Sequence, residues 1–176
     1  GDNDTLDVNF TGVLGAISID LSSATDQITT FNGLTEATVQ KGFESVDLAG
    51  YANFGSQVIG SDEANTVTGT ASADTISLGK GADVYTVTAG NDQVDLGAGD
   101  DTVTFTGTLL AGHSGTTSNI DGGTGDDTVN TSTATLVDAD FRGITNMEVL
   151  DFTAGDSTLT YGDAAEATGI TKIDTS

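Results

Sequence analysis

Apolar residues recur in the middle of the chain at a regular interval of nine, most of them between polar neighbours. From Gly60 the sequence divides into five consecutive nine-residue units, and a sixth spans residues 122–130 after an interruption. Strand side chains alternate between two faces, so each unit is predicted to end in a short strand whose middle residue points inward. That residue occupies the eighth position, where an apolar, β-favouring side chain always stands: Val67, Ile76, Tyr85, Val94, Val103 and Val129.

The sixth position of every unit is equally regular. It is always Asp or Asn: Asn65, Asp74, Asp83, Asp92, Asp101 and Asp127. The first six residues of a unit are rich in Gly, which adopts positive φ without a Cβ clash, and therefore predict a turn. Two units make one coil of about 18 residues with a turn on each side, and successive coils stack as parallel sheets. The predicted fold class is all-β, a parallel β-roll of the β-helix kind, with flanking β linking segments of a repeat protein.

The flanks also alternate like strands, at Ala16–Leu21 and Val149–Phe152, and Asp163–Ala167 predicts one helical turn. Phe43–Leu48 is echoed 104 residues later by Met147–Phe152, which suggests a second, longer repeat. The chain contains no Pro, which suits uninterrupted strand ladders.

These patterns predict three regions. The first is an N-terminal β linking segment that starts at the end of a preceding roll, and the last is a C-terminal linking segment that resembles residues 30–59. The roll of nine-residue units lies between them and contains an insertion at 105–121. The boundaries are residues 1–59, 60–130 and 131–176.

Composition narrows the possible partners. Asp and Glu number 27 against 4 Lys and Arg, for a formal net charge of -23. Nucleic acid and anionic membrane surfaces are therefore poor partners, since both require a basic face, and we expect no membrane insertion. The chain has no Cys and no apolar stretch near the ~20 residues of a membrane span. In the absence of disulfides, a bound metal would stabilise the fold. We also expect the chain to be a fragment of a longer protein.

The spacing of the Asp-rich turns explains why that metal would be calcium. Turns on the same side of a stacked roll lie ~4.8 Å apart, so carboxylates from neighbouring turns converge. Two unit charges ~5 Å apart repel by about 3 kcal/mol at an effective dielectric of ~20. Ca²⁺ takes about six to eight oxygen ligands, which carboxylates and inward-turned backbone carbonyls supply. The pattern therefore predicts several Ca²⁺ ions, which we expect to drive folding.

The nine-residue units resemble the RTX repeat of secreted bacterial proteins, whose pattern is G-G-x-G-x-D-x-U-x with U large and apolar. The best matches are residues 96–104 and 122–130. The flanks resemble parts of surface-layer proteins and large adhesins that contain such repeats. The resemblance implies an extracellular location at the bacterial cell surface and export by type I secretion.

The resemblance also implies ligand sets that join neighbouring turns on one side. Carbonyls at positions two and four and the Asp at six come from one turn, and positions one, three and five come from the next. The first implied site joins Gly79, Gly81 and Asp83 to Leu96, Ala98 and Asp100. The second, on the other side, joins Thr70, Ser72 and Asp74 to Val87, Ala89 and Asn91. The third joins Thr88, Gly90 and Asp92 to Gly122, Thr124 and Asp126, if the insertion keeps the sides in phase. Asp101 and Asp127 are further candidate ligands at position six.

The first unit departs from the pattern. It carries Asn65 at position six, and the turn stacked on it offers Lys80 and Ala82. We expect this end of the roll to bind calcium weakly or to serve as a cap. A partial turn at Gly1–Asp4 would need a partner from a preceding roll.

Catalysis is not expected. His113 is the only histidine and lies in the insertion near Ser114 and Ser118, without a nucleophile-elbow pattern. No H-E-x-x-H motif is present. Paired carboxylates leave a glycosidase open by residue type, but the chain has no Trp and only 3 Tyr to form a sugar platform.

The leading hypothesis is a calcium-dependent structural module of a surface layer, adhesin stalk or fibre, which associates with like subunits and with cell-surface polysaccharide. One alternative is an accessory or secretion domain of an RTX enzyme or toxin, in which catalysis lies elsewhere. Another is a ligand-binding adhesin module for sugar or ice, suggested by rows of Thr such as Thr102 and Thr104. An upstream enzyme domain in the parent chain would favour the first alternative over the leading hypothesis.

Overall fold

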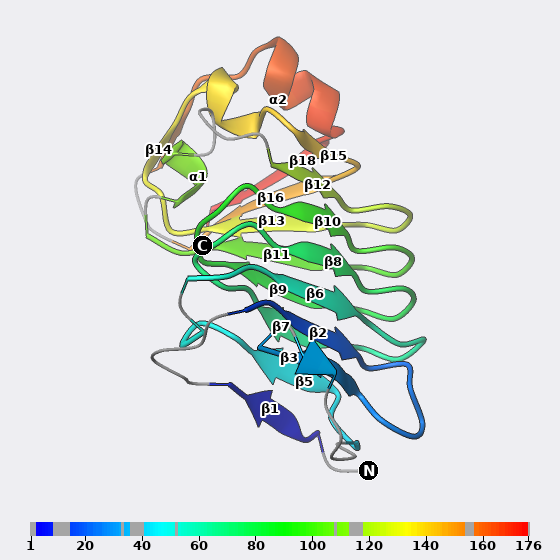
Figure 1. Ribbon diagram of the computed structural model, residues 1–176. Coiled ribbons are helices and arrows are strands. Elements are labelled where there is room, and N and C mark those ends of the chain that lie inside the picture. The colour runs from blue at the N-terminus through cyan, green and yellow to red at the C-terminus, as the bar shows by residue number, and fades with distance from the viewer. Residues whose placement is uncertain are drawn as a thin grey trace.

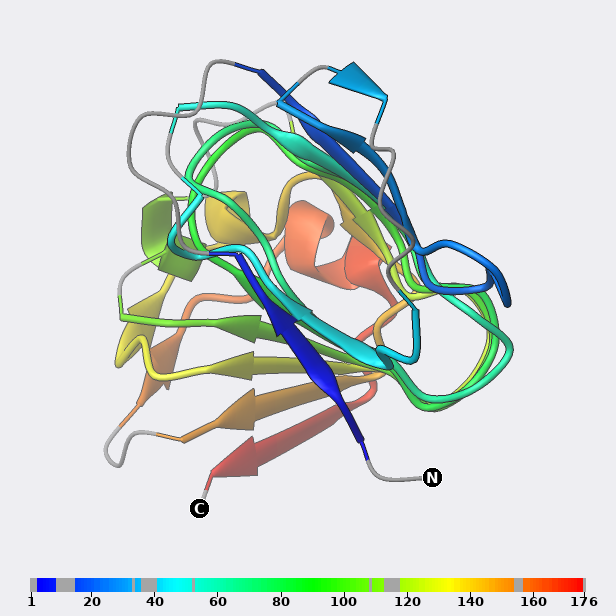
Figure 2. The same cartoon turned by 60° about the horizontal axis from the view of Figure 1, so that its bottom comes forward.

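The computed structural model describes residues 3–8, 15–32, 34–35, 41–51, 53–107, 109–112, 118–153 and 157–175. It is built almost entirely of short strands, arranged in two long sheets that face each other across one core (Figures 1 and 2). Through the nine-residue units the chain alternates between the sheets, one strand at a time. This is the predicted parallel β-roll.

The first sheet, called sheet A, has eight strands that pair in parallel throughout. In spatial order they are β1 (Thr5–Asp7), β5 (Ser45–Asp47), β7 (Thr66–Thr68), β9 (Val84–Val87), β11 (Thr102–Phe105), β13 (Thr128–Thr131), β16 (Val149–Phe152) and β18 (Lys172–Thr175).

The second sheet, called sheet B, is parallel from β15 to β2 and ends in antiparallel pairs through β3 and β4. In spatial order its strands are β15 (Ile144–Thr145), β12 (Asn119–Asp121), β10 (Gln93–Asp95), β8 (Thr75–Ser77), β6 (Ser56–Ile59), β2 (Ile17–Asp20), β3 (Ile28–Phe31) and β4 (Leu34–Thr35).

The register confirms the coil of two units. Val67 pairs with Tyr85 and Tyr85 with Val103, each 18 residues further along. Ile76 and Val94 pair in the same way in sheet B. The six residues at position eight are all 3% exposed or less, so the apolar periodicity marks the core that the two sheets enclose.

The insertion adds one half-coil of its own. It contains the short helix α1 (Leu109–Gly112) and then β12, which pairs with β10 in sheet B. The chain therefore returns to sheet A after the insertion, and β13 pairs with β11. This phase decides which turns stack on each other.

The flanking segments extend the same two sheets. On the C-terminal side, β14 (Thr135–Leu136) and β17 (Thr158–Leu159) form a small separate pair, and the 3-10 helix η2 spans Asp138–Phe141. Helix α2 (Asp163–Thr168) forms where the sequence predicts a helical turn and packs on η2 and β15 (Figure 1). It lies at the end of sheet B beyond β15, whereas sheet A continues to β18.

Candidate metal sites in the stacked turns

The turns of the roll form two columns, one along each side. Column A consists of the turns that lead into sheet A, which follow β6, β8, β10 and β12 along the right of Figure 1. Column B consists of the turns that lead into sheet B. Column A contains residues 60–65, 78–83, 96–101 and 122–127, and column B contains 69–74 and 87–92.

A ladder of position-six side chains runs through column A. The backbone N–H of Asn65 donates to Oδ1 of Asp83 at 2.7 Å, and that of Asp83 donates to Oδ1 of Asp101 at 2.7 Å. The N–H of Asp101 continues to Oδ1 of Asp127 at 2.8 Å. Asp83, Asp101 and Asp127 are 1% exposed or less, and the Oδ2 atom of each is buried without a hydrogen-bond partner among the described residues. Buried carboxylate oxygens without partners are costly, so each needs an ion or a proton.

The pKa values of the ladder also show that its buried carboxylates lack compensating charge. Burial raises the pKa of Asp83 to about 6, and the carboxylate of Asp101 adds to the rise. Burial likewise raises the pKa of Asp127 to about 6, together with the carboxylates of Asp101, Glu148 and Asp100. The described ion pairs are Lys80–Asp62 and Lys172–Asp174, both exposed, so neither neutralises the ladder.

Glycine at positions two and four lets successive column A turns approach closely. Gly97 and Gly99 have φ of +104° and +147°, and the corresponding glycines at 79, 81, 123 and 125 are also in the positive region. A Cβ on Gly99 would lie 1.6 Å from the carbonyl oxygen of Gly81, and one on Gly97 would lie 2.1 Å from that of Gly79. Carbonyls at positions two and four therefore abut the next turn, where only glycine fits.

The donors in this column are carboxylate and carbonyl oxygens, the ligands that Ca²⁺ prefers. The structure stacks Gly79–Asp83 on Leu96–Asp100, as the first predicted site requires, with Ala98 N–H donating to Gly79 O at 2.9 Å. Within the described residues there is no group of three or more His, Cys, Asp or Glu able to hold a metal. A site here would combine two carboxylates with backbone carbonyls, which makes Ca²⁺ a better match than Zn²⁺.

In column B, the carboxylate oxygens of the buried Asp residues accept hydrogen bonds from protein groups. Oδ1 of Asp74 accepts hydrogen bonds from the N–H of Ser56, its hydroxyl and the hydroxyl of Thr70, at 2.7, 2.9 and 2.9 Å. Oδ2 accepts the N–H of Thr70 at 2.8 Å. Both oxygens of Asp74 are therefore satisfied by the protein itself.

Asp92 is also held by protein groups. Its Oδ1 accepts the N–H of Asp74 at 3.0 Å, and its Oδ2 accepts the hydroxyl of Tyr85 at 3.3 Å. Its own N–H donates to the Ser118 hydroxyl at 3.0 Å, so a hydroxyl replaces the next carboxylate of this column. Burial raises the pKa of Asp92 to about 7, with a further contribution from Asp74.

The second predicted site lies in this column. The structure brings its two turns together, since the Thr88 hydroxyl donates to Thr70 O, and it places Ser72, Ala89 and Asn91 in those turns. The oxygens of Asp74, however, already accept hydrogen bonds from Ser56 and Thr70. The ligand role of this set is an untested prediction, and the hydrogen bonds that already satisfy Asp74 argue against it.

The third predicted site is wrong in its pairing. Because the insertion supplies a whole half-coil, the Gly122–Asp127 turn stacks on the column A turn 96–101 and not on Thr88–Asp92. Thr124 bridges to Ala98, and Asp126 N–H donates to Oδ1 of Asp100 at 3.0 Å. The pairing that the structure makes joins Gly97, Gly99 and Asp101 to Gly122, Thr124 and Asp126.

The first unit has the features of a cap. Oδ1 of Asn65 accepts the N–H of Ser61 at 2.7 Å, and its amide nitrogen donates to Glu44 O at 3.2 Å. Lys80 pairs with Asp62 at 2.6 Å on the surface of the same turns. An amide thus stands at position six, where later turns have Asp, and Ala82 stands at position five, where later turns have Asp100 and Asp126. Weak binding at this end stays a prediction.

Sequence reasoning missed three groups that the structure places in the columns. Tyr85 was recognised as a core residue, but its hydroxyl bond to Asp92 was not foreseen, and Ser118 was considered only as a nucleophile. Glu148 accepts the N–H of Asp127 at 2.8 Å and extends column A beyond the last unit. Its only sequence signal is the echo of Phe43–Glu44 at Met147–Glu148.

His113, Ser114, Gly1 and Asp2 lie outside the described residues, so the expectations placed on them are not tested. Among the helices of the described chain, none is long and apolar enough to cross a membrane.

Comparison with known families agrees with this geometry. The model of the RTX calcium-binding nonapeptide repeat matches four copies, at residues 59–94, 81–105 and 118–133. The matched stretches contain every turn of columns A and B defined above. No curated protein and no solved structure matches the chain. The chain therefore contains RTX calcium-binding repeats, as the sequence resemblance implies.

Proposed function

We propose that these RTX repeats form a calcium-dependent structural module of a secreted bacterial surface protein, such as a surface layer, adhesin stalk or fibre. Ions bound between the turns of column A would drive folding and prepare the roll for assembly. The observation that supports this most directly is the row of buried, unpartnered Oδ2 atoms on Asp83, Asp101 and Asp127. The proposal assigns no catalysis to the chain.

Two column A sites fit the ion best. Gly79, Gly81 and Asp83 would hold one Ca²⁺ with Leu96, Ala98 and Asp100. A second would be held by Gly97, Gly99 and Asp101 with Gly122, Thr124 and Asp126. Each bound ion cancels two formal charges in a chain whose net charge is -23.

Binding of calcium and folding of the roll are energetically coupled. Without an ion, neighbouring column A carboxylates repel by about 3 kcal/mol per pair at ~5 Å and an effective dielectric of ~20. That repulsion is a large fraction of the stability of an ordinary domain. A preformed site is absent from the unfolded chain, so the free energy of binding adds to the stability of the roll.

The location follows from the calcium concentrations inside and outside a cell. RTX repeats are typical of secreted proteins, and weak extracellular sites of this kind bind at about 10⁻⁴–10⁻³ M. The low calcium of the cytosol would keep the chain unfolded for type I export. Millimolar calcium outside would fold it.

The ends of sheet A support assembly with like subunits. In the described part of the chain, strands β1 and β18 each have one neighbour only, and the edge of a parallel sheet offers unpaired backbone groups. Ile173 of β18 lies in register with buried Leu150 yet is 49% exposed. A following repeat or a second copy would cover it. Cell-surface polysaccharide is a second proposed partner of the assembly.

Circular dichroism and electron microscopy with and without calcium test the proposal. We expect a disordered spectrum in chelator, β structure in millimolar Ca²⁺, and association only in the second state. Equimolar Mg²⁺ serves as the control, because its octahedral preference fits this donor set poorly. A spectrum that calcium leaves unchanged would contradict the folding claim, and monomers in millimolar Ca²⁺ would contradict the assembly claim.

A further inference from the structure

Column A does not stop at the last nine-residue unit. The link from β15 to β16 is a turn of three residues, 146–148, where the preceding turn has six, 122–127. Glu148 takes the place of the position-six Asp. Asp127 N–H donates to Oε2 of Glu148 at 2.8 Å, and the N–H groups of Glu148 and Val149 both return to Asp127 O at 2.9 Å.

The junction encloses one of the orphaned oxygens. Asp127 is 0% exposed, and its Oδ2 has no hydrogen-bond partner among the described residues. The carboxylate of Glu148 is close enough to raise the pKa of Asp127. The carbonyl oxygen of Asn146 lies 2.0 Å from the position that a Cβ on Gly122 would occupy, so the backbone of the short turn packs closely against that of the last unit.

The same arrangement occurs a second time in the chain. Asp4 N–H donates to Oε2 of Glu44 at 2.9 Å, and the N–H groups of Glu44 and Ser45 return to Asp4 O at 3.1 and 3.2 Å. The backbone carbonyl of each glutamate also pairs with the first residue of the next strand in sheet A. Glu44 O accepts the N–H of Thr66, and Glu148 O accepts the N–H of Lys172. Strands β1, β5 and β7 thus correspond to β13, β16 and β18. The Asp–Glu pair is therefore a recurring junction, and in the second copy its Asp is buried.

We propose that Asp127 and Glu148 hold a further divalent cation, which fastens the C-terminal segment to the roll. The inference rests on the proposed calcium function. Its donors are the two carboxylates and the position-two and position-four carbonyls of Gly123 and Gly125, which have the positive φ of the earlier turns. The three-residue turn lacks the residues that would complete the ligand shell. The junction site therefore binds its cation more weakly than the two column A sites do, and it keeps water ligands.

The cation at this junction orders the last strand and helix of the chain. Glu148 O accepts the N–H groups of Thr171 and Lys172 at 2.8 and 3.0 Å, so fixing Glu148 fixes the start of β18. Met147 N–H donates to Thr168 O at 2.8 Å, which ties the end of α2 to the same turn. Occupancy of the junction thereby controls whether the edge strand of sheet A is in place for a following repeat.

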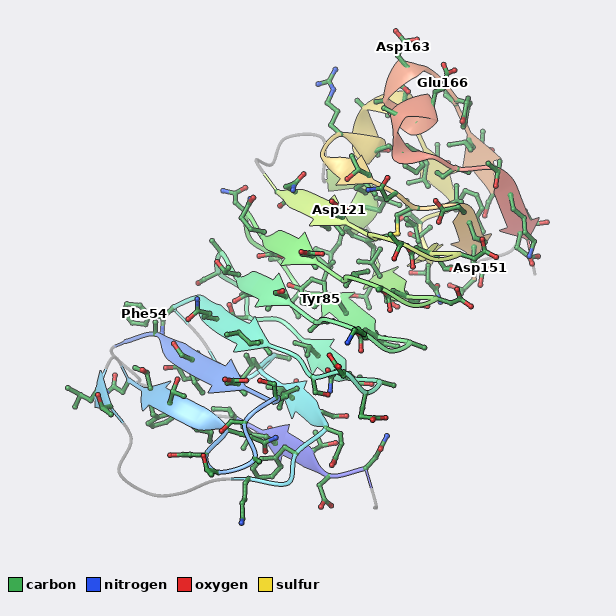
Figure 3. The ribbon with its side chains drawn as sticks, turned by 90° about the vertical axis from the view of Figure 1, so that its right-hand side faces the viewer. Phe54, Tyr85, Asp121, Asp151, Asp163 and Glu166 are labelled. Carbon is green, nitrogen blue, oxygen red and sulfur yellow. The ribbon has the colours of Figure 1, made fainter. Side chains whose placement is uncertain are left out.

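Calcium titration of wild type, Glu148→Gln and Glu166→Gln tests the inference. In Glu148→Gln the side-chain amide keeps an oxygen that accepts the N–H of Asp127, but the charge is lost. Glu166 is exposed on α2 (Figure 3), so its replacement is a control that removes an equal charge. By calorimetry, wild type and Glu166→Gln bind one ion more than Glu148→Gln. In hydrogen exchange, protection of 148–153 and 171–175 appears at about tenfold higher calcium than protection of 79–104, and Glu148→Gln loses this later step.

Each outcome separates the inference from the function on which it rests. If Glu148→Gln binds as many ions as wild type, the junction site is refuted while the calcium function stands. If no variant binds calcium, the proposed function itself fails. Should Glu148→Gln fail to fold, exchange in the wild type decides, because protection of the roll and junction in one step contradicts a weaker junction site.

Discussion

Columns A and B start from the same nine-residue frame and bury the same residue, the Asp at position six, yet satisfy it in different ways. In column A, Asp83 and Asp101 each have one buried carboxylate oxygen without a hydrogen-bond partner among the described residues. The neighbouring glycines have positive φ, which lets successive turns approach closely. In column B, hydroxyls of Ser56, Thr70 and Tyr85 reach the carboxylates of Asp74 and Asp92. Both arrangements keep the register of the roll.

The difference shows that position six alone does not define a calcium site. A buried Asp needs a partner for each oxygen, and a nearby hydroxyl meets that need as well as a cation does. Glycine at positions two and four makes the other contribution, because it brings carbonyl oxygens against the next turn. On this account the calcium dependence of the roll comes from column A, and column B contributes none of it.

Removing charge from the centre of each column should separate them most clearly. Asp101→Asn keeps the acceptor for the N–H of Asp83 but removes the charge shared by the stacked turns. We expect the calcium concentration at the folding midpoint to rise about 10–100-fold. Asp74→Asn, the column B control, should leave the number of bound ions unchanged and lower the free energy of unfolding by about 1–3 kcal/mol. Calorimetry and calcium-dependent circular dichroism measure both, and equal loss of ions in the two variants would refute the asymmetry.

A methyl group at a position-four glycine tests how closely the turns of column A pack. Gly99→Ala places a Cβ 1.6 Å from Gly81 O at a φ of +147°, so the two turns must separate. We expect a loss of roughly 3–5 kcal/mol in stability at saturating calcium, because the substitution strains the backbone and also distorts the ion site. Ser72→Ala, at position four of a column B turn, removes a hydroxyl and adds no Cβ, so this control should cost under about 1 kcal/mol. Denaturant unfolding in calcium gives both values, and similar losses would count against the close packing of column A.

The two forms of the protein should respond to pH in opposite directions. The pKa of Asp83 is raised to about 6 and that of Asp92 to about 7, whereas an unfolded Asp titrates near ~4. The metal-free fold therefore binds more protons than the unfolded chain, and its stability is greatest below ~4 and is lost as the pH rises through these values. Calcium requires ionised carboxylates, so its affinity falls as the pH drops below about 6. Circular dichroism at pH 5 and 7.5, in chelator and in calcium, measures this. The metal-free chain, disordered at pH 7.5, should gain β structure at pH 5, whereas the calcium-bound fold should become less stable; the same sign in both would contradict the account.

Tyr85→Phe should have the smallest effect. It removes one hydroxyl hydrogen bond to Oδ2 of Asp92, which costs about 0.5–1.5 kcal/mol, and it leaves the ring in the core. The loss should be the same in calcium and in any metal-free state that folds, because the bond lies in column B. Comparison of unfolding curves at two calcium concentrations checks this, and a change in calcium affinity would place Tyr85 in an ion site.

Much of the fold could be predicted from the sequence because it depends on a short, exact period. Val67, Ile76 and their equivalents repeat every nine residues, and the 18-residue coil follows from strand alternation and the alternating turns. The phase of column A after the insertion could not be predicted, since the length of residues 105–121 does not reveal that they contain a strand of sheet B.

The candidate site was less accessible for a physical reason. Which Asp lacks a partner depends on side chains outside its own turn, such as Tyr85, which donates to Asp92, and Ser56, which donates to Asp74. The role of Glu148 depends on a shortened turn that no longer fits the nine-residue pattern. Period and composition identify the acids, whereas only the stacking shows which oxygens are left for an ion.

The most direct test of the central claim is a crystal structure in millimolar calcium, with the ions located by their anomalous scattering. The account predicts ions between turns 78–83 and 96–101 and between 96–101 and 122–127, with none between 69–74 and 87–92. Ions in column B beside Asp74, or a folded roll with no ion in column A, would contradict it.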